Sequence, residues 1–298
     1  MLLGVVLAYF YRLHSGAPWR IDPLVIATAL AAVCLVASAN YVINEWFDAP
    51  FDRRHPEKCN RPVARGAVGG KTVFVFWAAL LLAGGGLAWS INRPFFVAAC
   101  VFALMGAVYN VPPVRLKDWP YLDVLTESVN NPLRLLLGWF AVSATSVPPL
   151  SLVVSYWMAG GFFMAGKRLA EIRSIGDHAT AGAYRASFRY YDDTTLLIQM
   201  FFYATAAALF LGVFIVRYHV ELILSIPLIA GFFAFYLSIT LKPHSAAGSP
   251  ERLYRERRLM AYLAVCLVVF VLLMFVELDA LRRLLNVPEA SVPPLWRL

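Results

Sequence analysis

Long apolar segments separated by short polar connections dominate this sequence. They lie at about residues 2–13, 24–47, 72–91, 94–111, 121–145, 149–168, 194–216, 220–241 and 259–278. A membrane-spanning helix needs about 20 apolar residues to cross about 30 Å of hydrocarbon. The first segment is too short for this unless it extends through Trp19. The pattern therefore predicts about nine transmembrane helices.

The fifth apolar segment differs from the others because it carries polar side chains at Asp123, Glu127, Asn130, Asn131 and Arg134. Their spacing recurs at helical intervals, so on one helix they share a face that cannot contact lipid. Ionisable residues inside a membrane usually mark a functional site. A structural pair of opposite charges is the alternative, and the spacing leaves both open.

The composition supports a membrane protein. Hydrophobic residues make up 60% of the 298 residues, and charged residues make up 15%. Soluble domains are about 45–50% apolar and about 25% charged, so a soluble globule of this size could not bury so much apolar surface. Disordered chains and disulfide-rich secreted domains are excluded as well. We expect an all-α, polytopic membrane protein with a single domain over residues 1–298.

Basic residues gather in four connections, at about residues 48–71, 112–120, 165–193 and 242–258. With an odd number of spans these connections share one side of the membrane, and the positive-inside rule assigns that side to the cytoplasm. The net charge of +8 then needs no nucleic-acid partner. The same connections also hold most of the acidic residues, which topology does not require. We therefore expect a metal-and-phosphate site on the cytoplasmic face of the cell (inner) membrane.

The end of the second apolar segment carries candidate metal ligands. Asn44, Asp48 and Asp52 are spaced four residues apart, which places their side chains on one face of a helix even if Pro50 bends it. Oxygen ligands of this kind suit Mg²⁺, which binds through one or two carboxylates together with substrate phosphates. A solvated helix end with acidic residues is the alternative interpretation.

A basic loop follows these carboxylates, from Arg53 to Gly66, and its cations could neutralise a diphosphate. Asn-Asp-x-x-Asp-x-x-x-Asp followed by a basic Arg-Pro-(Ile/Val)-x-x-Gly segment is the signature of the UbiA superfamily of intramembrane transferases, which this sequence resembles. Glu45 stands where that signature has its first Asp. Glu45 is off the face of the three candidate ligands, so metal binding need not be lost.

Three further segments resemble the same superfamily. The stretch from Tyr109 to Lys117 is similar to its Tyr-Ser-x-Pro-Pro-x-(Arg/Lys)-x-Lys loop. Where most members carry a second Asp-x-x-x-Asp motif, this chain has Ala-Gly-Lys-Arg-Leu-Ala-Glu, at residues 165–171. That segment resembles the polyprenyl-phosphate (decaprenyl-phosphate) phosphoribosyltransferase branch. So do His55–Lys58, the pair Asp123 and Arg134, and the Arg-Ala-Ser-Phe stretch that begins at Arg185.

The resemblance implies a helical bundle around a central cavity, capped by the cytoplasmic loops, with Mg²⁺ at the first motif. The implied metal ligands are Asn44, Asp48 and Asp52. The implied catalytic residues are Asp48, Asp52, Asp123, Glu127 and Tyr109. The implied substrate-binding residues are Arg53, Lys58, Arg61, Arg115, Lys117, Arg134, Lys167 and Arg168.

Two enzymatic functions remain open, and both act on an isoprenoid lipid with loss of diphosphate. In the first, phosphoribosyl diphosphate is the donor and a polyprenyl phosphate is the acceptor. This one explains Lys167 and Arg168, since two substrate phosphates then need neutralising. In the second, a prenyl diphosphate alkylates an aromatic or other polar acceptor. A membrane transporter is a third possibility, although no internal repeat of the kind common in transporters is visible.

Overall fold

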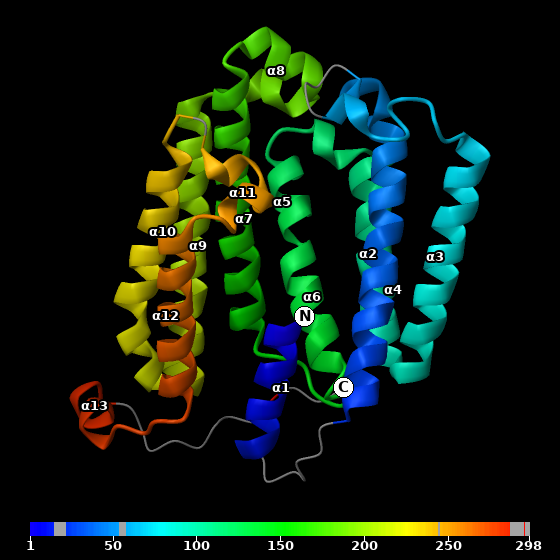
Figure 1. Cartoon of the computed structure of the whole chain (residues 1–298). Helices are drawn as coiled ribbons and strands as arrows, with labels where there is room; N and C mark the ends of the chain where they lie inside the picture. The colour runs from blue at the N-terminus through cyan, green and yellow to red at the C-terminus, as the bar shows by residue number, and fades with distance from the viewer. Residues whose placement is uncertain (15–21, 54–57, 244, 287–294, 296–298) are drawn as a thin grey trace. The chain divides into compact units, whose positions relative to one another are not determined.

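The computed structural model describes residues 1–14, 22–53, 58–243, 245–286 and 295. Within these residues the regular structure is helical and no strand is present, which confirms the all-α class (Figure 1). The chain divides into two compact units. The first is built mainly from Met1–Pro148 and Ala179–Tyr190, and the second from Pro149–His178 and Tyr191–Pro294.

Most helices of the first unit precede residue 149. They are α1 (Leu2–His14), α2 (Pro23–Asp52), η1 (Lys58–Asn60), α3 (Gly70–Ile91), α4 (Arg93–Asn110), η2 (Leu116–Asp118), α5 (Leu122–Ser128) and α6 (Asn130–Phe140). This unit also takes in nearly all of α8 (His178–Tyr184) and the whole of η3 (Ala186–Tyr190). The remaining helices belong to the second unit: α7 (Leu150–Ile175), α9 (Asp193–Tyr218), η4 (Val220–Ser225), α10 (Ile226–Thr240), η5 (Ala246–Gly248), α11 (Pro250–Leu253), α12 (Arg257–Met274) and α13 (Asp279–Leu284).

Six helices in the described part of the chain are long and apolar enough to cross a membrane, so the count of nine is not confirmed. They are α2, α3, α4, α9, the continuous stretch Val220–Thr240 and α12. Helix α1 has 13 residues, in line with the short first apolar segment. Helix α7 has 26 residues but carries charged side chains in its C-terminal half.

Apolar side chains cover the outer faces of these helices. On α3, Val75 is 70% exposed, Leu82 is 77% exposed and Trp89 is 68% exposed. Soluble monomers rarely expose large apolar side chains in such continuous stretches, whereas lipid solvates them well. The chain is therefore an integral membrane protein.

Helix α2 carries the predicted metal face and extends further than expected. It begins at an N-cap where the Asp22 side chain accepts hydrogen bonds from the main-chain N–H groups of Leu24 and Val25, followed by Pro23 in its first turn. It continues through Pro50 to Asp52, so the expected loop at 48–71 begins five residues late. The missing N–H of a proline removes one helical hydrogen bond, which a helix tolerates close to its end.

The fifth apolar segment forms two helices, which corrects the prediction of one continuous polar face. Helix α5 ends at Ser128 and α6 begins at Asn130. Pro132 lacks the N–H that would bond the carbonyl of Ser128, so the helical ladder is interrupted there. Asp123 and Glu127 are therefore on one helix and Arg134 on the next.

Small residues allow helices of the first unit to pack closely. A Cβ on Gly4 would lie 2.0 Å from the carbonyl oxygen of Leu135, so α1 and α6 meet through their backbones. A Cβ on Gly106 would lie 2.1 Å from the side chain of Asn40, which donates a 3.0 Å hydrogen bond to the carbonyl of Phe102. This contact fixes α2 against α4, the two helices whose ends build the site.

The second unit packs α7 against α9 and α10. Gly166 lets Tyr236 and Met200 approach α7 closely. The helix ends at Ile175, where Gly176 adopts the left-handed conformation that favours glycine at a helix C-terminus. The expected loop at 165–193 therefore starts about ten residues late, and Lys167 and Arg168 lie on a helix rather than in a loop.

Candidate active site

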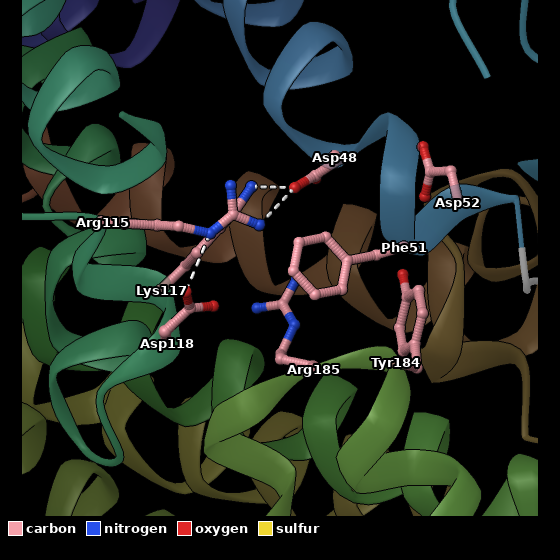
Figure 2. A pocket seen from close by; sticks show the side chains of 8 residues that line it. All are labelled: Asp48, Phe51, Asp52, Arg115, Lys117, Asp118, Tyr184 and Arg185. Carbon is pink, nitrogen blue, oxygen red and sulfur yellow. Dashed lines mark hydrogen bonds and ion pairs between the residues drawn. The ribbon is translucent and has the colours of Figure 1, made fainter. Parts of the chain in front are cut away.

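A polar pocket lies at the end of α2 within the first unit (Figure 2). In Figure 2, Asp48, Phe51 and Asp52 of α2 lie in the upper part of the view, and Tyr184 and Arg185 lie below them. The pocket is lined by Asp48, Phe51, Asp52, Arg115, Lys117, Asp118, Tyr184 and Arg185. The lining thus includes both predicted metal-ligand carboxylates and two of the predicted phosphate-binding cations.

Arg115 anchors this pocket. Its guanidinium donates to Asp48 Oδ1 at 2.9 Å and to Asp118 Oδ2 at 2.8 Å. Two more hydrogen bonds, of 3.1 and 3.2 Å, reach the main-chain carbonyls of Phe47 and Asn110. The backbone of Arg115 has a φ of 29°, a left-handed conformation that costs a non-glycine residue roughly 1 kcal/mol or more. The four bonds hold this conformation and connect α2, α4 and η2.

Lys117 lies deeper, with only 2% of its surface exposed. Its ammonium donates to Asn44 Oδ1 at 3.0 Å, to Asn110 Oδ1 at 2.9 Å and to Asp48 Oδ1. Burial lowers the pKa of Lys117 to about 8, although the Asp48 carboxylate acts in the opposite direction. Figure 2 shows Lys117 and Arg115 both directed at Asp48, so that one carboxylate binds two cations.

The basic loop after α2 folds back on the helix. Arg61 forms a 2.8 Å ion pair with Asp52, whose side chain is 3% exposed. Glu45 accepts a hydrogen bond of 3.4 Å from the main-chain N–H of Val63, so it supports the loop. Arg53 donates to the carbonyl of Ala64 at 3.0 Å and does not line the pocket. The expected match at residues 55–57 lies outside the described residues.

The sequence analysis did not name Phe51, Asp118, Tyr184 or Arg185 as site residues, although all four line the pocket. Arg185 is the cation among them. Its Nη1 lies 3.2 Å from the hydroxyl of Tyr109 and 3.9 Å from the carboxylate of Asp123. Asp123 is 0% exposed and also accepts a 3.3 Å hydrogen bond from Ser187. The Arg-Ala-Ser-Phe resemblance was the signal that pointed to this segment. Because Asp123 is buried beneath Arg185, its proposed role changes from facing the substrate to positioning the guanidinium.

Several other predicted residues do not line the pocket. Lys58 donates to the hydroxyl of Tyr184 and lies 4.9 Å above its ring, so it touches a lining residue. Tyr109 contacts two lining residues: its hydroxyl accepts a hydrogen bond from Arg185, and its ring lies 5.9 Å from the Lys117 ammonium. Arg134 on α6 stacks 5.6 Å from the ring of Phe102, while Glu127 is partly buried on α5.

Lys167 and Arg168 lie on α7 in the second unit. Arg168 is 2% exposed and pairs with Glu171, one helical turn further along, at 3.0 Å. This pair orients the Arg168 guanidinium. The part of both cations in donor binding stays a prediction.

The oxygen set at the end of α2 fits a divalent metal when a substrate supplies further oxygens. Among the described residues no group of three or more His, Cys, Asp and Glu side chains is arranged as a metal site. However, Asn44 Oδ1 and Asp48 Oδ1 converge on one ammonium, that of Lys117. A single cation therefore already bridges these two oxygens, and Mg²⁺ typically uses one or two carboxylates plus phosphate oxygens.

The sequence is similar to those of several known proteins. A model of the UbiA prenyltransferase family matches residues 1–260. Decaprenyl-phosphate phosphoribosyltransferase of Mycobacterium tuberculosis is 31% identical over 192 residues, which cover 63% of this chain and 60% of that protein. Nodulation protein NoeC of Azorhizobium caulinodans is 28% identical over 188 residues, covering 63% of this chain and 59% of that protein. The matches thus span about three fifths of these relatives.

The fold is also similar to a solved structure, a UbiA homolog from Archaeoglobus fulgidus bound to DMAPP and Mg²⁺. The TM-score is 0.65 at 19% identity, and the alignment covers 93% of this chain and 96% of that chain. At this identity the likeness concerns the fold.

Proposed function

Because the chain belongs to the UbiA prenyltransferase family, we propose that it is a membrane transferase whose donor is a diphosphate ester bound with Mg²⁺. The best-supported donor is phosphoribosyl diphosphate, and the acceptor is a polyprenyl phosphate. The observation that carries the proposal is the pocket itself, where the carboxylates of α2 meet Arg115, Lys117 and Arg185. A metal–diphosphate complex needs both kinds of group at one place.

The residues have distinct roles in this proposal. Asn44, Asp48 and Asp52 hold the metal. Lys117 and Arg185 bind diphosphate oxygens, while Arg115 keeps Asp48 and η2 in place through its four hydrogen bonds. Bound Mg²⁺ supplies Lewis-acid stabilisation of the leaving diphosphate.

In the transfer step, an oxygen of the acceptor phosphate forms a bond to C1 of the ribose. The bond between C1 and the diphosphate oxygen breaks, and diphosphate departs with its electron pair. Cationic side chains aimed at that oxygen stabilise the charge that develops on it. Arg185 and Lys117 are the cations of the pocket that can do so.

Two observations favour a phosphoribosyl donor. The first is the basic pair Lys167 and Arg168. Enzymes that use a prenyl diphosphate typically have a second acidic motif at this place in the sequence. The second is the similarity to the mycobacterial phosphoribosyltransferase. A prenyl diphosphate donor is the second candidate, and it is favoured by the fold shared with the archaeal homolog that binds DMAPP and Mg²⁺.

We further propose that the pocket faces the cytoplasm in the inner membrane. Arg61 of the basic loop after α2 pairs with Asp52, which lines the pocket, and Arg115 and Lys117 of the next basic connection line it themselves. Positively charged connections are retained on the cytoplasmic side of a membrane. A water-soluble donor such as phosphoribosyl diphosphate would reach the pocket from that side.

Donor use by the purified protein tests the proposal. The protein in nanodiscs is incubated with Mg²⁺, polyprenyl phosphate and phosphoribosyl diphosphate labelled in the ribose. Parallel samples contain a labelled prenyl diphosphate and an aromatic acceptor. Lipid products are extracted and separated from the donor by thin-layer chromatography. Asp48→Asn serves as the matched inactive control because it keeps the shape of the side chain and removes its charge.

We expect label from phosphoribosyl diphosphate in a lipid product, only in the presence of Mg²⁺ and only with intact Asp48. Product from the prenyl donor alone would establish the second candidate. Product from neither donor, with a correctly folded protein, would contradict both.

A further inference from the structure

Each N–H donor of the Lys117 ammonium has an acceptor oxygen. An ammonium has three N–H donors, and the structure gives Lys117 three acceptors: Asn44 Oδ1, Asp48 Oδ1 and Asn110 Oδ1. The side chain is 2% exposed, so water does not replace these partners. Two of the three acceptors are proposed metal ligands.

We infer that Lys117 is an internal counter-cation that competes with the metal for Asn44 and Asp48, and that it moves to the diphosphate when donor and metal bind together. The inference rests on the proposed metal–diphosphate site. It adds that this chain binds its metal and its diphosphate cooperatively, and it names the residue that couples them.

Direct competition follows from the positions of the oxygens. A divalent ion held by Asn44 Oδ1 and Asp48 Oδ1 would use the two oxygens to which the ammonium now donates. If the metal bound alone, Lys117 would keep only Asn110 as a partner and would be buried beside a like charge, which is strongly unfavourable. A diphosphate removes this penalty because its oxygens accept the displaced ammonium.

The neighbouring cation is less suited to this movement. Arg115 also binds Asp48, but it is held by Asp118 and by two main-chain carbonyls, so it stays when Asp48 changes partner. Lys117 has a flexible four-carbon stem and a compact charge. Its remaining ligand, Asn110, is not a proposed metal ligand and supports the ammonium from α4.

Two binding measurements test the inference without requiring turnover. The first is Mn²⁺ alone, measured as protein-bound ion by electron paramagnetic resonance. The second is ³²P-labelled inorganic diphosphate at saturating Mn²⁺, measured by equilibrium dialysis. The variants are Lys117→Met, Asn110→Ala and the control Lys71→Met. Lys71 is exposed on α3, so its variant loses the same charge away from the pocket.

The two affinities of Lys117→Met should change in opposite directions. Mn²⁺ alone should bind about tenfold to a hundredfold more tightly than to wild type, the range expected for removing competing hydrogen bonds of a charged group. Diphosphate should bind more weakly by a similar factor. Asn110→Ala removes the one partner that Lys117 would keep beside a metal bound alone, so this variant should bind Mn²⁺ several-fold more weakly than wild type. It keeps the test open if Lys117→Met does not fold. Lys71→Met should match wild type.

Unchanged or weaker Mn²⁺ binding by Lys117→Met would overturn the inference, and so would unchanged or tighter Mn²⁺ binding by Asn110→Ala. The proposed function would stand in that case if wild type still bound diphosphate with Mn²⁺. If wild type bound no Mn²⁺ even with diphosphate, the metal site and the inference would both be wrong.

Discussion

Replacing Arg185 by glutamine should impair donor use much more than it impairs folding. Arg185 lines the pocket together with Asp48 and Asp52, and its Nη1 lies 3.2 Å from the Tyr109 hydroxyl and 3.9 Å from the Asp123 carboxylate. Because its positive charge lies beside the proposed metal ligands, we expect it to bind the diphosphate of the donor. A hydrogen bond to a charged group contributes about 1.5–3 kcal/mol, so kcat/KM should fall roughly tenfold to a hundredfold.

The matched control is Arg189→Gln in η3, the short helix that follows Arg185. Arg189 is exposed and donates to the carbonyl of Gly182 at 3.2 Å, away from the pocket lining. The Arg189→Gln substitution therefore removes one positive charge close to Arg185 without changing the pocket lining. Steady-state kinetics with phosphoribosyl diphosphate, normalised to folded protein, should show the loss for Arg185→Gln and wild-type constants for Arg189→Gln. Equal constants for both variants would refute the assignment of Arg185 to the donor.

The same experiment separates a positioning role for Asp123 from a catalytic one. If Asp123 acts through Arg185, Asp123→Asn should raise KM for the donor and should add little once Arg185 is already Gln. Ser187→Ala, which removes the 3.3 Å hydrogen bond to Asp123, should give a smaller effect in the same direction. A full additional loss in the double variant would show that Asp123 contributes independently of Arg185.

Three further predictions concern the metal face, α7 and the topology. Asp48→Ala and Asp52→Ala should each abolish Mg²⁺-dependent turnover in protein that still inserts into the membrane, and wild-type rates in EDTA would exclude the metal site. Lys167→Ala and Arg168→Ala should raise the donor KM by about tenfold or more if they bind a phosphate, whereas unchanged constants would remove the main reason for preferring a phosphoribosyl donor. Single cysteines introduced at Lys71 and Ser249 should be protected from an impermeant thiol reagent in intact cells, and labelling of either from outside would break the assigned topology.

Local sequence patterns were sufficient to predict where a helix lies and which of its side chains share a face. The apolar segment at 72–91 became α3, with bounds Gly70–Ile91, because length and hydrophobicity alone determine whether a helix can cross a membrane. The spacing of Asn44, Asp48 and Asp52 likewise predicted a shared face, and α2 continues as a helix through all three. Position on a helix follows from a period of about 3.6 residues, which the sequence states directly.

Other features depended on which segments meet. Lys117 and Asp48 are 69 residues apart, and Arg185 and Tyr109 are 76 apart, so no local pattern pairs them. The sequence analysis predicted Arg115 and Lys117 as substrate-binding cations. The structure adds that both pair with Asp48, a contact that no local pattern indicates. Asp123 likewise pairs with Arg185, which is 62 residues away in the sequence.

The sequence by itself determined the helical class, the membrane character, the shared helical face of Asn44, Asp48 and Asp52, and the family resemblance. Each of these depends on residue type and on spacing over a few turns. Only the tertiary structure decided which cation binds each carboxylate, and that Arg185 and Asn110 join the site. A buried charge must find a partner when water is excluded, and the partner available is fixed by how the helices pack.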